Sequence, residues 1–150
     1  MKKLSILFLL AAGFIADVPA QDVKIITIVE SIVPGGIGRS RMIENTSKVD
    51  VSAFTTSRKE GTDGGEQRKV SRKSIKVDEF NETKLLNFFS LFGINFQNIA
   101  SNDAIIAQRT AELLAQGYEL QHVASGVESN AGEPDGQGIF VTRMFFIKNP

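Results

Sequence analysis

His122, the only histidine of the chain, is the first residue to consider for acid–base or nucleophilic chemistry. A histidine that acts as a general base needs a partner that orients its ring and a nucleophile within hydrogen-bond reach. Its neighbours along the sequence supply neither, and the chain has no Gly-x-Ser-x-Gly nucleophile turn. The sequence leaves open a hydrolase that uses His122 with nearby carboxylates, but it favours a structural or surface role for this residue.

The chain contains no cysteine and a single histidine, so it has almost none of the side chains that transition-metal sites and cysteine nucleophiles require. Residues 128–138 form a glycine-rich segment whose acidic side chains include Glu128 and Asp135. Calcium takes six to eight oxygen ligands, and carboxylates on a loop could supply some of them. Their spacing does not match an EF-hand, so we interpret the segment as a solvated loop and expect no cofactor.

Residues 33–40 read VPGGIGRS, which invites comparison with a phosphate-binding loop. Such a loop needs glycine at its first position and lysine before the final serine or threonine, whereas Val33 and Arg39 stand there. We therefore predict a glycine-rich hairpin connection. Together with other polar groups of the predicted sheet and loops, it supplies our set of possible contact residues: Gly35, Gly36, Arg39, Arg41, His122, Glu128, Asp135 and Arg143.

Basic residues gather in residues 58–76 and could bind an anionic surface through phosphate or sulfate groups. Glu60, Asp63 and Glu66 dilute that charge, and no aromatic side chain is interleaved for base stacking. We therefore expect no nucleic-acid partner. Dense charge and few apolar residues also predict a mobile loop at about 57–74.

The first 20 residues have the pattern of a secretory signal peptide. Lys2 and Lys3 precede an apolar stretch, residues 4–16, that is too short to span a bilayer comfortably, and small residues precede a cleavage position after Ala20. We expect an exported protein, periplasmic or extracellular. No later stretch is long and apolar enough for a membrane helix, so we expect no membrane span after cleavage.

Residues 21–150 have the length of one domain. The leader holds Lys2, Lys3 and Asp17, so the 17 basic and 17 acidic residues of the whole chain become 15 and 16. This near-neutral balance gives no global attraction to nucleic acid or to an anionic membrane. The eleven phenylalanines of the chain, two of them in the leader, provide apolar volume for a packed core without disulfides.

The spacing of apolar residues predicts the secondary-structure elements of residues 21–150. Dense β-branched and aromatic residues predict strands over residues 23–33, 39–44, 118–125 and 138–147. Helical spacing predicts one helix from Asn81 or Thr83 to Gly93, and a second from Ser101 or Asn102 to Gly117. Residues 45–57 are ambiguous, residues 74–77 could begin a strand, and residues 94–99 suit a short strand or linker.

Strict alternation along residues 118–125 would point Tyr118, Leu120, His122 and Ala124 to one side of the sheet. Residues 139–147 are apolar in both alternating phases, which is typical of a strand covered on both faces. The second cover would be the N-terminal part of this chain or a second copy of it. We therefore expect a homo-oligomer.

Residues 111–123, AELLAQGYELQHV, followed by RMFFIK at residues 143–148, resemble the bacterial domain of unknown function 4177. That family places a helix before Gly-(Trp/Tyr)-Glu-Leu and ends on a strand finishing in Phe-x-(Lys/Arg); Tyr118 stands where tryptophan is commoner. Residues 27–43 also resemble the opening of uncharacterised exported bacterial proteins. The resemblance covers about half of residues 21–150, implies a small α+β sheet domain and implies no activity.

The sequence thus predicts a single α+β domain, an antiparallel sheet of four to five strands with two helices packed on one face. The predicted function is a non-catalytic exported module for binding or assembly, whose contact is the sheet face or the glycine-rich loops. The alternatives are the His122 hydrolase and a binder of anionic surfaces through residues 58–76.

Overall fold

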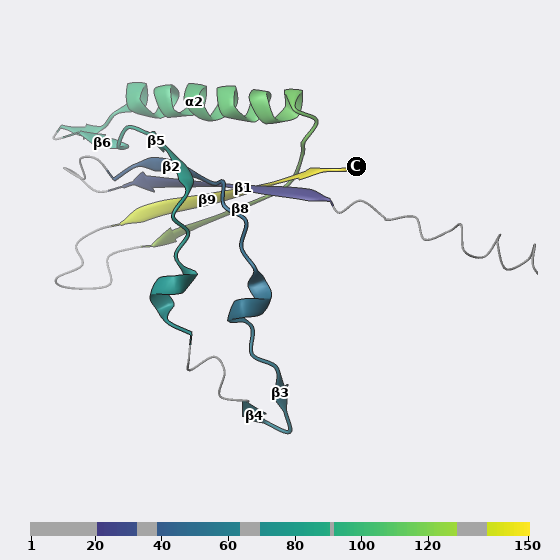
Figure 1. The fold of residues 1–150 in the computed structure, drawn as a ribbon. Coiled ribbons are helices and arrows are strands. Elements are labelled where there is room, and N and C mark those ends of the chain that lie inside the picture. Colours follow the sequence, from purple (N-terminus) through teal and green to yellow (C-terminus); the bar gives the residue numbers. More distant parts are fainter. Residues whose placement is uncertain (1–20, 33–38, 64–69, 91, 129–137) are drawn as a thin grey trace, which may run out of the picture.

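The chain has an α+β fold built on a five-stranded antiparallel sheet (Figure 1). The computed structural model describes residues 21–32, 39–63, 70–90, 92–128 and 138–150; the predicted leader and the glycine-rich connection at 33–38 lie outside them. The strand order is β5-β2-β1-β9-β8. The strands are β1 (Asp22–Ser31), β2 (Arg41–Asn45), β5 (Phe80–Lys84), β8 (Glu119–Glu128) and β9 (Ile139–Lys148).

The centre of the sheet is the long pair β1–β9, in register from Asp22 opposite Lys148 to Ser31 opposite Ile139. Both strands are β-branched or aromatic along most of their length, which favours extended backbone. The strands predicted over residues 23–33, 39–44, 118–125 and 138–147 are confirmed, with small shifts of their ends. The antiparallel pairing of β1 with β2 also confirms the predicted hairpin.

One long helix, α2 (Phe96–Ala115), packs on one side of this sheet. Asn95 caps it, because its side chain accepts a hydrogen bond from the backbone N–H of Asn98. The predicted start at Ser101 or Asn102 is therefore wrong, and residues 96–99 belong to the first turn rather than to a strand or linker. The predicted end is correct, since Gly117 follows the helix with φ of 87°, a conformation that glycine adopts without steric cost.

The prediction of two helices is wrong, because α2 is the only helix longer than a single turn among the described residues. Phe80–Lys84 instead forms β5 and pairs with β2. After it, β6 (Phe89–Ser90) pairs with β7 (Gly93–Ile94) in a small separate sheet. The apolar residues of this stretch do recur at helical spacing. The backbone of β5, however, forms its hydrogen bonds with β2, and Leu85 reaches the core from an extended segment.

The core lies between α2 and the sheet. Leu113, Tyr118 and Phe146 belong to one buried cluster there, and Ile105 and Ile106 of α2 pack against it. The remaining buried apolar residues are Ile26, Ile28, Met42, Leu85 and Met144. No described residue of β8 is buried, so the core is covered by β1, β2 and β9 rather than by the edge strand β8.

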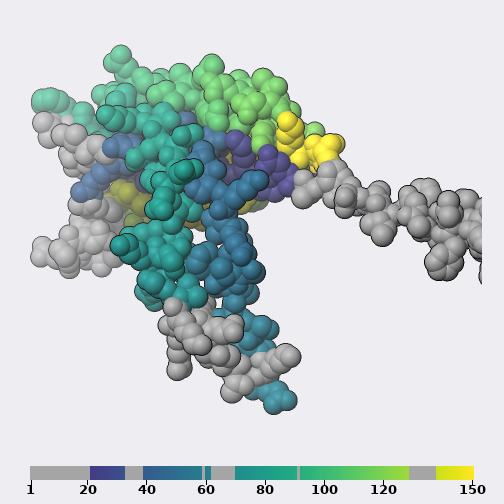
Figure 2. All heavy atoms as spheres, viewed as in Figure 1, coloured from purple at the N-terminus to yellow at the C-terminus, as the bar shows by residue number. Residues whose placement is uncertain are grey.

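Residues 46–63 and 70–79 form an arm that leaves the sheet between β2 and β5 and projects on the side opposite α2 (Figure 1). Its described parts are two 3-10 helices, η1 (Val51–Phe54) and η3 (Arg72–Ile75), and the short pair β3 (Arg58–Lys59) and β4 (Thr62–Asp63). Figure 2 shows the arm as a narrow extension of the molecule. The suggested strand at residues 74–77 is wrong, because η3 occupies its first part; the mobility of residues 57–74 stays a prediction.

None of the described helices is both long enough and apolar enough to cross a bilayer.

Candidate functional site

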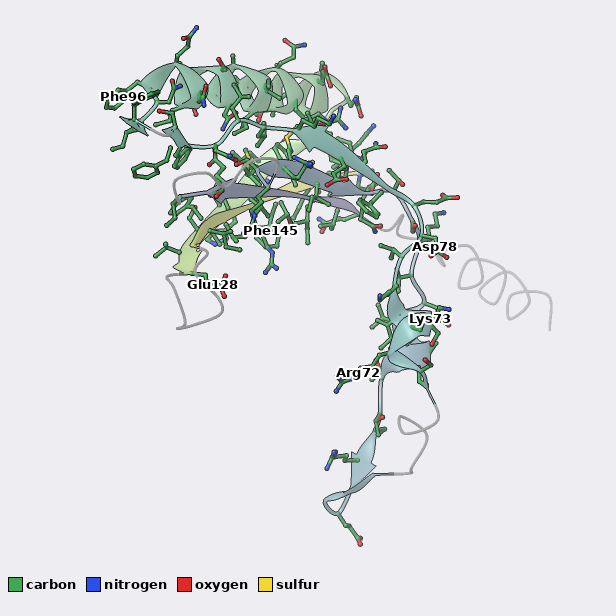
Figure 3. All side chains as sticks on the ribbon, turned by 90° about the vertical axis from the view of Figure 1, so that its left-hand side faces the viewer. Arg72, Lys73, Asp78, Phe96, Glu128 and Phe145 are labelled. Atoms are coloured by element: carbon green, nitrogen blue, oxygen red, sulfur yellow. The ribbon has the colours of Figure 1, made fainter. Side chains whose placement is uncertain are left out.

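One face of the five-stranded sheet has no described element packed on it. Side chains of directly opposed residues in a sheet lie on the same side, and Ile26, Ile28 and their partners face α2. The alternate residues therefore form the opposite side, which we call the uncovered face; Figure 3 shows Phe145 on that side. Its central members are Val23, Ile25, Thr27, Val29, Arg41, Ile43, Val141, Arg143, Phe145 and Ile147.

The uncovered face is mostly apolar and partly open to solvent. Val23 and Ile25 are 54% and 42% exposed, and most of the other apolar members are half-buried by their neighbours on the sheet. Arg143 is exposed in the middle of β9, and Arg41 pairs with Glu82 of β5 at 3.0 Å. The face therefore offers a contact surface with an apolar centre and a few charged groups.

Four of the predicted contact residues lie on the uncovered face: Arg41, Arg143, His122 and Glu128. Arg39 is exposed and precedes β2. Gly35, Gly36 and Asp135 lie outside the described residues. The structure thus brings side chains of β8 and β9 onto the same face as Arg41 of β2, which is distant in the sequence.

The predicted alternation of β8 is wrong at one position. A β-bulge between Leu120 and His122 breaks the register, so that Leu120 pairs with Phe146 while His122 pairs with Phe145. Because Phe146 and Phe145 point to opposite sides of the sheet, Leu120 lies on the helix side and His122 on the uncovered face. One extra residue, which period-two counting cannot detect, decides the side on which His122 appears.

The ring of His122 lies against Phe145, with 5.9 Å between ring centroids. Among the described residues, no serine, threonine or carboxylate forms a hydrogen bond with it. The hydrolase alternative requires such partners, and the described surroundings of His122 lend it no support.

A charged cluster joins α2 to the helix side of the sheet. The carboxylate of Glu44, on β2, accepts a hydrogen bond from Lys24 Nζ at 2.9 Å and from Arg109 Nη2 at 2.6 Å. Burial opposes ionisation of Glu44, but the hydrogen bonds and charges of Lys24 and Arg109 outweigh it and lower the pKa of Glu44. Arg109 also pairs with the exposed carboxylate of Glu112 at 2.7 Å.

An open groove of about 290 Å³ runs beside this cluster, between α2 and the strands β2 and β5. Its charged lining residues are Glu44, Arg109 and Glu112, and Arg109 already pairs with both carboxylates. We therefore assign the cluster a structural role in holding α2 on the sheet, and not the role of a charged ligand site.

A second polar connection centres on Asn102, a fully buried residue of α2. Asn102 donates through Nδ2 to Glu30 Oε1 at 3.0 Å and to the carbonyl of Leu86 at 2.7 Å, and its Oδ1 accepts from the N–H of Leu86 at 2.8 Å. Burial raises the pKa of Glu30, an effect that the hydrogen bond from Asn102 partly offsets and the charge of Asp103 increases. These bonds join α2, β1 and the segment after β5.

Tyr118 closes the other end of the core. Its hydroxyl donates a hydrogen bond to Asp22, and this bond is the main reason why its pKa is raised to about 12. The ammonium groups of Lys24 and Lys148 lie 5.4 and 5.8 Å from its ring centroid. This set ties the start of β1 to the end of α2.

Sequence reasoning missed these helix-side polar groups. A signal was available in the spacing of these residues. Glu30 lies two residues after Ile28 and Glu44 two residues after Met42, so each carboxylate is on the same side of its strand as buried apolar residues. A carboxylate in phase with a buried apolar face needs a buried partner. Arg109 and Asn102, the partners that the fold provides, are more than 60 residues away in the chain.

The chain matches no family model, no curated protein and no solved structure. Similarity to the domain of unknown function 4177 therefore stays a prediction from the sequence.

Proposed function

We propose that the chain is an exported, non-catalytic module for binding or assembly, and that the uncovered face is its contact surface. The observation that carries the proposal is the apolar centre of that face, from Val23 to Phe145, with no described element packed on it. Exposed apolar patches of several hundred Å² on soluble proteins usually mark contact sites. Export rests on the leader pattern in residues 1–20.

The size of the face supports a macromolecular partner. Strands lie about 4.8 Å apart and rise about 3.4 Å per residue, so each strand residue covers about 16 Å² of a sheet. β1, β8 and β9 have ten residues each and β2 and β5 have five, which gives about 650 Å² on each side of the sheet. A stable protein interface buries about 800 Å² per partner, so the face supplies most of one.

The first prediction is that Ile25, on the uncovered face, is protected in the native exported material. The chain has no cysteine, so single-cysteine variants report on one position each. We expect Ile25→Cys to react with a small maleimide severalfold more slowly in the exported fraction of the producing cell than after purification and dilution. Full-length protein carrying its own leader is used, and its intact mass shows whether the recovered chain begins at Gln21.

The matched control is Ala111→Cys, on an exposed position of α2. It should react equally fast before and after dilution, because the uncovered face lies on the other side of the sheet. Equal rates for Ile25→Cys in both samples would contradict the proposed contact surface. Recovery of the full-length mass would contradict the proposed removal of residues 1–20.

The projecting arm gives the anionic-surface alternative a specific basis. Arg72 and Lys73 lie in η3, exposed and away from the sheet (Figure 3). Basic groups on such an extension can reach phosphate groups on a surface, and their binding weakens with salt.

If the arm acts in this way, the chain binds anionic lipid vesicles at low salt and Lys73→Glu weakens that binding. Lys84→Glu is the control, because Lys84 is an exposed lysine on β5 and the change in charge is the same. Co-sedimentation with vesicles at two salt concentrations measures the effect. Binding that is independent of salt, or that both variants weaken equally, would contradict a role of the arm.

A further inference from the structure

Strand β8 is the last strand of the sheet in the part of the chain that the structure describes. It pairs with β9 along one side, and no described strand pairs with its other side. All ten of its residues are exposed. The outward backbone N–H and C=O groups of such an edge are ready to pair with another strand.

The two edges of the sheet differ in how they are protected. Edge strands in soluble proteins are commonly short, or carry charges, lysine or proline that oppose pairing with other chains. β5, at the opposite edge, has five residues and includes Glu82 and Lys84. β8 is twice as long, and between Glu119 and Glu128 it has no acidic, lysine, arginine or proline residue. Beyond its β-bulge, from His122 to Val127, the β8 edge therefore lacks the usual protection against pairing.

The helix side of β8 carries apolar side chains that α2 leaves open. Leu120, Val123 and Val127 are 40%, 47% and 62% exposed. α2 packs instead against the core on β1, β2 and β9, and its polar contacts with the sheet go to Glu30 and Glu44. An apolar strip thus lies beside the free edge, where a strand added to β8 would bring side chains to cover it.

We infer that β8 pairs in antiparallel fashion with β8 of a second copy of this chain, across a two-fold axis. The register that fits best centres on Ser125 and uses residues 122–128, the regular part of the strand beyond the bulge. Ser125 then faces itself, Val123 faces Val127 of the partner, and His122 faces Glu128 of the partner. Each of the last two pairs occurs twice by symmetry.

Charge and side-chain type favour this register. Opposite residues on a sheet stabilise it when apolar meets apolar or when a carboxylate meets a hydrogen-bond donor, and like charges destabilise it. The full-length register would place Glu119 opposite Glu128 at both ends. The register centred on Ser125 avoids that repulsion and offers the His122 ring to the carboxylate of Glu128.

The dimer would extend the proposed function and rests on it. Two five-stranded sheets would join into one, with their uncovered faces side by side and still open to a partner. The arm leaves the sheet between β2 and β5, at the other end of the strand order, so it does not stand beside the β8 edge.

Sedimentation velocity over a dilution series of the full chain, produced with its own leader, tests the inference. We expect a monomer–dimer equilibrium whose dissociation constant rises about tenfold or more in Val123→Lys, because lysine at the middle of an edge opposes pairing. Val51→Lys is the control, since Val51 is an exposed valine on the arm. A monomer at all concentrations would overturn the inference, and so would a dimer that Val123→Lys leaves intact.

Charge reversal tests the register. His122→Glu and Glu128→Lys should each weaken the dimer, and the double variant should restore it, because Glu at 122 then faces Lys at 128 of the partner. A dimer that Glu128→Lys alone strengthens would overturn the register and point to pairing of Glu128 with Glu119. Ser125→Cys, on the two-fold axis, should form a disulfide dimer under mild oxidation, whereas Ala111→Cys should not.

The outcomes separate this inference from the proposed contact surface. Slow labelling of Ile25→Cys together with a monomer that Val123→Lys does not change would keep the uncovered face as a contact and reject the β8 pairing. Loss of the dimer in Val123→Lys, together with fast labelling of Ile25→Cys in both samples, would keep the β8 pairing and reject the uncovered face as a contact surface.

Discussion

Asn102→Ala is expected to lower the free energy of unfolding by about 3–4 kcal/mol, a large share of the stability of a domain of this size. The side chain is fully buried and makes three hydrogen bonds, two with the backbone of Leu86 and one with Glu30. Alanine would leave the partly buried N–H and carbonyl of Leu86 and the buried carboxylate of Glu30 without these partners, at about 1–3 kcal/mol for each unsatisfied group before relaxation and water entry.

Urea denaturation followed by circular dichroism measures this loss. Gln108→Ala, an exposed position on the same helix whose hydrogen bond to Glu112 is also exposed, should change the free energy of unfolding by less than about 0.5 kcal/mol. An equally small effect of Asn102→Ala would mean that the connection between α2, β1 and the segment after β5 does not hold the helix in place.

Glu44→Gln is expected to lower the free energy of unfolding at neutral pH by about 2–4 kcal/mol. The Glu44 side chain is 8% exposed and is shared between Lys24 and Arg109. Glutamine keeps the shape but removes the charge, which leaves two partly buried cations without their common carboxylate. Because Arg109 belongs to α2 and Lys24 to β1, the loss weakens the packing of the helix on the sheet.

The pH dependence of this effect has a definite sign. The pKa of folded Glu44 lies below its usual value of 4.5, so its contribution is fully present above the unfolded pKa and is lost as pH falls through the folded pKa. The difference between wild type and Glu44→Gln should therefore shrink below about pH 4.5. Urea titrations between pH 3 and 7 test this, and a difference independent of pH would contradict the electrostatic explanation.

Glu112→Gln is the matched control, because it removes another carboxylate from the same guanidinium group. Its side chain is 45% exposed, and exposed ion pairs contribute little. The variant should unfold close to the wild-type midpoint at every pH. An equal effect of both substitutions on the free energy of unfolding would show that the contribution of the Glu44 ion pairs does not depend on the burial of Glu44.

The sequence by itself determined the strands that form the centre of the fold. β1 and β9 are apolar and β-branched or aromatic over most of their length, and such residues favour extended backbone whatever their partners. The end of the long helix was equally local, since Gly117 accepts φ of 87° without cost. Arg41 and Arg143, two of the predicted contact residues, lie on one face of the sheet once these strands pair.

Only the tertiary structure decided the rest, because the competing local patterns have similar energies. The apolar residues in 80–94 have helical spacing. Their conformation is nevertheless determined by the pairing of β5 with β2 and by the hydrogen bond between Leu86 and Asn102 of α2. Asn95 at the cap and Asn102 in the helix both bond to residues outside the helix, Asn95 through its N–H to the carbonyl of Phe88 and Asn102 to Glu30 and Leu86. The bulge before His122 depends on pairing with β9, and it settles which side chains of β8 meet the helix side and which meet the uncovered face.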